Sequence, residues 1–217
     1  MRDLRLKYSP VAMAFHWVIA LLIIANFAIA WIMNGHALIW SWGEMHGPAK
    51  LSLVQYHKSI GITVLVLSVL RLIWRLIVPP PPFSAHLAPW EKALAHTVHW
   101  LFYVFMIAMP LAGWAMVSAS PRIKVFPVSF WGLFNWPAFP GFSGMAPDQL
   151  KAAHHFLGDL HTDWMAWVGY ALIALHLAGA LKHQFFDRDN ELARMVPGLG
   201  TPGRRGLGTS GRRGIIG

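Results

Sequence analysis

The histidines are the residues of this sequence whose type and spacing best suit metal or redox chemistry. The 217-residue chain contains 12 histidines and no cysteine. Without cysteine there can be no disulfide, iron–sulfur cluster or thiolate-bound zinc, so a metal would have to be bound through imidazole. An ionisable side chain inside an apolar segment is costly and by default indicates function. Six histidines lie in such segments, namely His16, His57, His96, His99, His161 and His176.

His161 and His176 stand 15 residues apart in the last apolar segment. In an α-helix this spacing places them roughly 22 Å apart along the axis and about 60° apart around it. One membrane-spanning helix would then present a histidine near each face of the membrane. His16, at the start of the first segment, matches the depth of His176, whereas His57, at the start of the second, matches His161.

Two stacked bis-histidine sites, with neither cysteine nor carboxylate nearby, favour low-spin haem b over zinc or a di-iron centre. A bis-histidine iron has no free position, so such sites would transfer electrons and would not bind oxygen. A single histidine inside a membrane can instead be a hydrogen-bonded packing residue. We therefore expect His96 and His99 not to be ligands, and the loop residues His36, His46 and His86 to be solvated.

The composition predicts the elements that position these histidines. Hydrophobic residues make up 56% of the chain and charged residues only 12%, where a soluble protein carries about 25% charged residues. Four apolar segments have the roughly 20 residues that a helix needs to cross a membrane. They cover approximately residues 11–33, 51–78, 93–120 and 160–186. The predicted fold class is an all-α, integral membrane four-helix bundle, with residues 1–196 forming one membrane domain that holds two haems.

The net charge of +9 does not indicate nucleic-acid binding, because the basic residues flank the apolar segments. Lys and Arg gather mainly on the side of the two termini, which predicts that both termini are cytoplasmic. Residues 121–150, rich in proline, glycine and aromatic residues, would then form an outer loop at the membrane surface. The Gly/Arg-rich tail, residues 197–217, lacks apolar periodicity, and we expect it to be disordered and to lie against anionic lipid.

Short motifs in a fixed order connect this sequence with a known family. They are Tyr8-Ser9 with Phe15-His16-Trp17, His57-Lys58-Ser59-Ile60-Gly61, Arg71-Leu72-Ile73-Trp74-Arg75, Pro110-Leu111-Ala112-Gly113-Trp114, and Ala174-Leu175-His176 through Lys182-His183 to Asp187-Arg188-Asp189. Together they resemble the prokaryotic cytochrome b-561 family from Tyr8 to Pro197. The resemblance implies a four-span, di-haem b protein of the bacterial inner membrane. The best understood activity of this type is superoxide oxidation coupled to ubiquinone.

The resemblance implies axial haem ligation by His16 with His176 and by His57 with His161, the pairs that depth also favours. It implies a spacing of about 14 residues between the two ligands of the fourth span, which keeps them within about 40° of each other. Here the spacing is 15, and a local π-bulge could absorb the extra residue. The alternative ligands to His161 are His154 and His155.

The same resemblance implies a quinone near the inner haem. His183 and Lys182 could contact it and supply the hydrogen-bond donor and proton that a quinone needs, although Lys182 is equally suited to anchoring the chain on its positive side. Arg71 and Arg75 could bind haem propionates through bidentate hydrogen bonds, or could equally be anchors.

On the outer side, three basic residues surround the expected edge of the outer haem. Even a modest positive field would steer a small anion such as superoxide toward them. These residues are Lys58, Arg122 and Lys124.

The predicted function is therefore transmembrane electron transfer, in which superoxide is oxidised at the periplasmic face and ubiquinone is reduced near the inner haem. No side chain is expected to be catalytic by itself, and the expected partners are membrane lipid, quinone and a one-electron donor. One alternative is a haem b anchor subunit that passes electrons between a partner dehydrogenase or hydrogenase and quinone. Another is a haem-free bundle that acts as a transporter or assembly factor.

Overall fold

The computed structural model describes residues 7–33, 48–83, 87–187 and 191–196. The loop histidines His36, His46 and His86 and the tail 197–217 lie outside them, so the expectations for these residues stay predictions.

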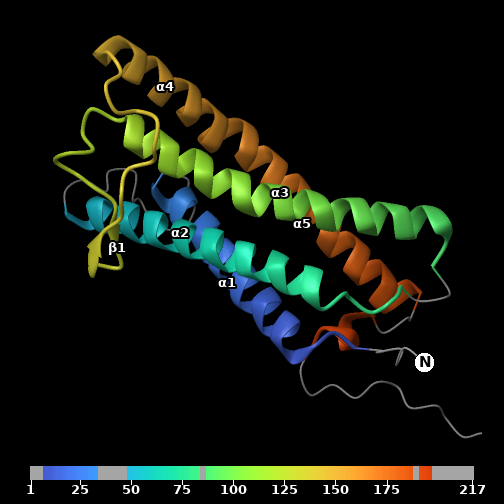
Figure 1. The fold of residues 1–217 in the computed structure, drawn as a ribbon. Coiled ribbons are helices and arrows are strands. Elements are labelled where there is room, and N and C mark those ends of the chain that lie inside the picture. The colour runs from blue at the N-terminus through green and yellow to red at the C-terminus, as the bar shows by residue number, and fades with distance from the viewer. Residues whose placement is uncertain (1–6, 34–47, 84–86, 188–190, 197–217) are drawn as a thin grey trace, which may run out of the picture.

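The chain folds into an all-α bundle whose four long segments are long and apolar enough to cross a membrane, which confirms the predicted fold class (Figure 1). The first three are the helices α1 (Pro10–Met33), α2 (Pro48–Ile77) and α3 (Pro89–Ala119). The fourth is continuous from Pro147 to Phe186. It comprises α4 (Pro147–Asp159), the π-helix η1 (Leu160–Trp164), α5 (Met165–Leu181) and a second π-helix, η2 (Lys182–Phe186). The short 3₁₀ helix η3 (Glu191–Arg194) follows.

The fourth segment begins earlier than the predicted span of 160–186, and its first turn takes the last residues of the predicted outer loop. Pro147 occupies the first helical turn, where its missing N–H costs nothing. The side chain of Gln149 accepts a hydrogen bond from the backbone N–H of Ala146, 3.1 Å away. The 13 residues of α4 are far more polar than those of α5, so hydropathy alone did not include them.

The bundle is packed around a small core and is apolar outside. The core contains Ile19, Ile60, Val64, Tyr103, Phe105, Met106 and Leu172. Gly169 lets α5 approach its neighbours closely, because a Cβ there would lie 2.6 Å from Phe105 Cζ and 2.8 Å from Phe27 Cζ. Large apolar side chains such as Leu21 and Leu76 are mostly exposed, as expected for a surface that faces lipid.

The loop after α3 contains a small hairpin that the sequence analysis did not predict. Strands β1 (Ser129–Phe130) and β2 (Phe134–Asn135) pair antiparallel, with Ser129 opposite Asn135. The buried hydroxyl of Ser59 on α2 donates to the Ser129 carbonyl at 3.1 Å and accepts from the Trp131 N–H at 3.0 Å. The hairpin is thereby fixed at one end of the bundle, and the start of α1 lies at the other (Figure 1).

Candidate haem sites

His57 on α2 and His161 in η1 face each other near the hairpin end of the bundle, and their ring centroids lie 6.0 Å apart. A metal held between two imidazoles requires two bonds of about 2 Å, plus roughly 1 Å from each nitrogen to its ring centre, or about 6 Å in all. Both rings line a cavity of about 860 Å³. The separation therefore fits a bis-histidine metal centre, and the cavity offers space for a large planar ligand beside it.

The orientation of His161 leaves one ring nitrogen for a metal. Its Nδ1 donates a hydrogen bond to the Met109 carbonyl, 3.0 Å away, which leaves Nε2 free. A backbone carbonyl bound at the second nitrogen is a frequent companion of metal-ligating histidine, since it fixes the tautomer and the ring plane. His154 instead donates from Nδ1 to the Met116 carbonyl at 2.8 Å. Among the described residues the cavity lining includes His161 but neither His154 nor His155.

The π-helix η1 accounts for the unusual spacing of the two histidines on the fourth segment. A π turn holds one residue more than an α turn, so 15 residues with one π turn rotate about as far as 14 residues of regular helix. The π-bulge that the spacing predicted is thus present at His161 itself. It lets His161 point toward His57 while His176, on α5, points toward His16.

The lining of this cavity carries two further signs that it holds a ligand. A Cβ on Gly113 of α3 would lie 2.8 Å from Cε1 and 3.1 Å from Nδ1 of His161, so glycine makes room for the imidazole. The side-chain oxygen of Asn26 is buried in the same lining without a hydrogen-bond partner among the described residues. Such an orphaned acceptor is costly unless a bound group or water satisfies it.

The second histidine cluster lies toward the opposite end of the bundle and contains three rings. The centroid of His176 is 6.2 Å from that of His16 on α1 and 5.7 Å from that of His99 on α3. The Nδ1 of His99 donates to the Ala95 carbonyl at 2.6 Å. From the sequence we expected His99 not to be a ligand, but its depth in the third span matches that of His16 and could have indicated its place in this cluster.

Two arginines of α2 turn inward beside this cluster. Arg71 Nη2 lies 3.3 Å from Nδ1 of His16. The guanidinium carbons of Arg71 and Arg75 lie 5.7 Å and 5.5 Å from the centre of the Tyr103 ring. Both charges therefore face α3 and the histidine cluster, within a part of the bundle that otherwise has few polar groups.

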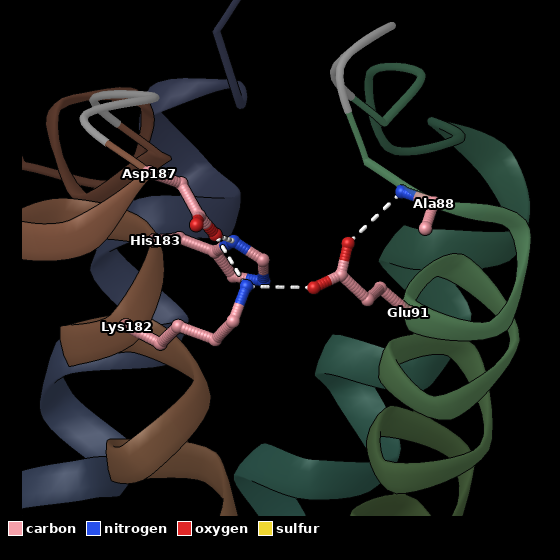
Figure 2. Close-up of polar contacts among 5 residues, drawn as sticks. All are labelled: Ala88, Glu91, Lys182, His183 and Asp187. Carbon is pink, nitrogen blue, oxygen red and sulfur yellow. Dashed lines mark hydrogen bonds and ion pairs between the residues drawn. The ribbon is translucent and has the colours of Figure 1, made fainter.

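A charged network joins the start of α3 to the end of the fourth segment (Figure 2). Lys182 Nζ donates to Glu91 Oε1 at 2.7 Å and to Asp187 Oδ2 at 2.6 Å, and His183 Nδ1 donates to the same Oδ2 at 2.7 Å. The hydrogen bond from Lys182 is the main reason that the pKa of Asp187 lies below its usual value. Glu91 and Asp187 were not predicted as site residues, although Asp187 is four residues after His183, a spacing that places side chains together on a helix.

Of the three basic residues expected around the outer haem, all of which the structure describes, only Lys58 lines the cavity. Its Nζ lies 4.6 Å from the centre of the Phe126 ring. Arg122 and Lys124 are exposed in the turn that precedes Phe126.

Comparison with known proteins places the chain in a family. The sequence profile of prokaryotic cytochrome b561 matches residues 7–198. The chain belongs to the prokaryotic cytochrome b561 family. It is 32% identical over 191 residues to cytochrome b561 homolog 2 of Escherichia coli K12, covering 88% of this chain and 91% of that protein.

Two further relatives are also similar to this chain over most of their length. A protein of Yersinia pestis named "Probable superoxide oxidase CybB" is 31% identical over 195 residues, which cover 88% of this chain and 96% of that protein. Cytochrome b561 homolog 1 of E. coli K12 is 31% identical over 198 residues, covering 88% and 97% of the two chains.

Membership in the cytochrome b561 family establishes the general chemistry of the chain. It is a membrane electron-transfer protein that binds haem b, and with its four apolar helices it is a multi-pass protein of the bacterial inner membrane. Haem b suits the residues present, since imidazole pairs at metal-bridging distance and an adjoining cavity are what a bis-histidine haem requires. Membership also favours haem-based electron transfer over the haem-free alternative.

Proposed function

We propose that this cytochrome b561 holds two haem b groups and passes electrons from superoxide at the periplasmic face to ubiquinone at the cytoplasmic side. The outer haem would be bound by His57 and His161, and the inner haem by His16 and His176. The observation that carries the proposal is the pair of facing imidazoles at each end of the bundle, with centroids 6.0 Å and 6.2 Å apart. A relative named for superoxide oxidation supports the choice of donor.

When bound, bis-histidine haem b carries one electron at a time and offers no open iron position to oxygen. The side chains then have to orient the ligands, balance charge and exclude competing reactions. His161 is oriented by its hydrogen bond to the Met109 carbonyl. His99, bonded to Ala95, would pack against His176 without binding iron, in keeping with the family pairing of His16 with His176.

Arg71 and Arg75 would bind propionates of the inner haem. Arginine always donates, so its contact with His16 makes Nδ1 of His16 an acceptor. Binding iron through Nε2 would place a proton on that same Nδ1, and the guanidinium would then need another acceptor. A carboxylate of the haem provides one and allows a bidentate pair.

The outer reaction would take place beside Lys58, with Arg122 and Lys124 at the adjoining surface. Two superoxide anions lose one electron each and leave as dioxygen, and one ubiquinone takes up both electrons and two protons to become ubiquinol. The positive side chains attract superoxide to the outer cavity, which raises its local concentration.

The quinone would bind at the cytoplasmic end of the fourth segment, next to Lys182 and His183. This place is supported by its position about two turns beyond His176 and by the polar network that surrounds it. A quinone reduced there needs a hydrogen-bond donor and a source of protons, both of which an imidazole or an ammonium can provide.

Spectra of the detergent-purified protein test this function. An enzymatic superoxide source should reduce the haems, a short-chain ubiquinone should then reoxidise them, and added superoxide dismutase should abolish the reduction. Haems that a chemical reductant and quinone can cycle but that ignore superoxide would contradict the proposed donor. That result would favour the anchor subunit of a partner dehydrogenase or hydrogenase instead.

A further inference from the structure

We propose that Asp187 positions His183 as the proton donor to the quinone, while Lys182 braces the bundle and is not the donor. This inference rests on the proposed function, because it concerns how the proposed quinone site delivers protons. It chooses between the two candidate donors of that site and adds Asp187 and Glu91 as positioning residues.

The decisive feature is that Lys182 and His183 share a single oxygen of Asp187 (Figure 2). Oδ2 of Asp187 accepts from Lys182 Nζ at 2.6 Å and from His183 Nδ1 at 2.7 Å. On the other side, Lys182 Nζ donates to Glu91 Oε1 at 2.7 Å. The second oxygen of Glu91 accepts the backbone N–H of Ala88 at 2.9 Å, which fixes the carboxylate at the start of α3.

The contacts of Lys182 suit a structural role, in which it connects the start of α3 to the end of the fourth segment. Its ammonium uses two of its three donors on carboxylates that come from α3 and from the end of the fourth segment. Removing a proton from Lys182 would leave these two carboxylates close together without the cation between them, which is electrostatically costly. The ammonium also takes the place that a divalent cation would need, although the ligand atoms of Glu91, His183 and Asp187 lie within 4.8 Å of one another.

His183 is held in a way that suits proton transfer. Its Nδ1–H is bound to Asp187, so Nε2 is the nitrogen left for a substrate. With its Nδ1–H held by Asp187, the ring can carry a second proton on Nε2. That proton can pass to a quinone oxygen as the quinone is reduced, which breaks the Nε2–H bond and forms an O–H bond. The ring keeps its Nδ1–H and its contact with Asp187, and cytoplasmic water reprotonates Nε2.

The network also keeps the Asp187 carboxylate ionised. The Lys182 hydrogen bond lowers the pKa of Asp187, so the carboxylate stays an anion and an acceptor. A neutral Asp187 could not balance the charge of a protonated His183. The side chain of His183 is only 16% exposed, against 45% for Lys182, so its ring is shielded while its environment remains polar.

The test uses the full-length haem-loaded protein and three variants, Asp187→Asn, His183→Gln and Lys182→Gln. Asparagine retains an oxygen that can accept from His183 but lacks the charge. In Asp187→Asn and His183→Gln we expect the kcat of ubiquinone reduction to fall by about tenfold or more, because general acid catalysis is typically worth 10²–10⁴-fold. The KM for quinone should stay within about twofold in Asp187→Asn, and Lys182→Gln should lower kcat less than either.

Two readouts separate this inference from the proposed function. Reduction of the haems by superoxide should be the same in all variants and in the matched control Asp148→Asn, which removes a carboxylate from the first turn of α4. If wild-type haems are not reoxidised by ubiquinone, the proposed function itself fails. If wild type and His183→Gln behave as expected but Asp187→Asn equals wild type, or Lys182→Gln is the slowest variant, only the positioning role is overturned.

Discussion

Among the residues that shape the outer site, Gly113 makes room for one of the two histidines. It allows the His161 ring to lie where a Cβ would be 2.8 Å away, a distance that forces something to move. In Gly113→Ala we expect His161 to be displaced and the outer haem to be lost, so the haem content should fall from two to one per chain.

A glycine elsewhere on the bundle serves as the control for this substitution. A Cβ on Gly179 of α5 would meet nothing within 4 Å, so Gly179→Ala should keep both haems and favour the helix slightly. The haem-to-protein ratio of the two purified variants is the measurement. Two haems in Gly113→Ala would contradict the account of the outer site.

The pairing in the inner cluster is tested at His99. The rings of His16 and His99 both lie near His176, and the proposal assigns the iron to His16. We expect His99→Leu to keep two low-spin haems and His16→Leu to keep one. The opposite result, seen in the optical and electron paramagnetic resonance spectra, would transfer the ligand role to His99.

Spacing and depth were sufficient to predict that His57 lies beside His161 and that His16 lies beside His176; that these four residues bind the haems stays a proposal. The depth of His99 matches that of His16, but its place beside His176 was not predicted, because a lone intramembrane histidine can equally serve packing and its hydrogen bond to Ala95 is invisible in the sequence. The places of Gly113 and Asn26 in the cavity lining could not be predicted from the sequence either, because they depend on how α1, α3 and η1 pack together.

At the scale of the elements, the π-helix η1 determines whether one helix can serve both sites. If it only absorbs an extra residue, removing that residue should restore a regular helix with the same two faces. We expect deletion of Thr162 to retain two haems per chain, because the remaining 14-residue spacing rotates about as far as 15 residues with one π turn.

The opposite change is the matched comparison. Insertion of an alanine after Thr162 adds about 100° of rotation, which should turn His161 away from His57 and cost one haem. The measurement is the haem content of the two purified variants. If the deletion variant lost haem and the insertion variant kept both haems, η1 would have another role.

The elements that sequence reasoning missed are short or polar. Strands β1 and β2 have two residues each, too few for an alternating pattern, and they depend on the distant hydroxyl of Ser59. The start of α4 at Pro147 lay outside the apolar window, although proline at the first position and Gln149 three residues after Ala146 are ordinary signals of a helix start.

The whole molecule would carry electrons in one direction, because its two ends differ in structure and charge. The hairpin and the start of α4 lie at one end, and the start of α1 and the π-helix η2, which contains Lys182, lie toward the other (Figure 1). The excess of Lys and Arg beside the termini predicts that the second end is cytoplasmic. Superoxide oxidation at the hairpin end and quinone reduction at the other would then move electrons inward.

Electrostatic steering of superoxide depends on the summed field of the charges at the outer face. In the double variant Lys58→Gln and Lys124→Gln we expect superoxide-driven haem reduction to slow severalfold at low ionic strength. Its dependence on salt should also become shallower, since screened charges no longer contribute. Stopped-flow rates across a salt series test this, and an unchanged rate with an unchanged salt slope would refute steering.

We propose that the chain holds two bis-histidine haems, one toward each end of the bundle. The most direct test is the haem-to-protein ratio of the purified protein and of His57→Ala, with electron paramagnetic resonance to establish the low-spin state. The account predicts two low-spin haem b groups in the wild type and one in the variant. A wild type with fewer than two haems, or a His57→Ala variant that keeps both in the low-spin state, would contradict it.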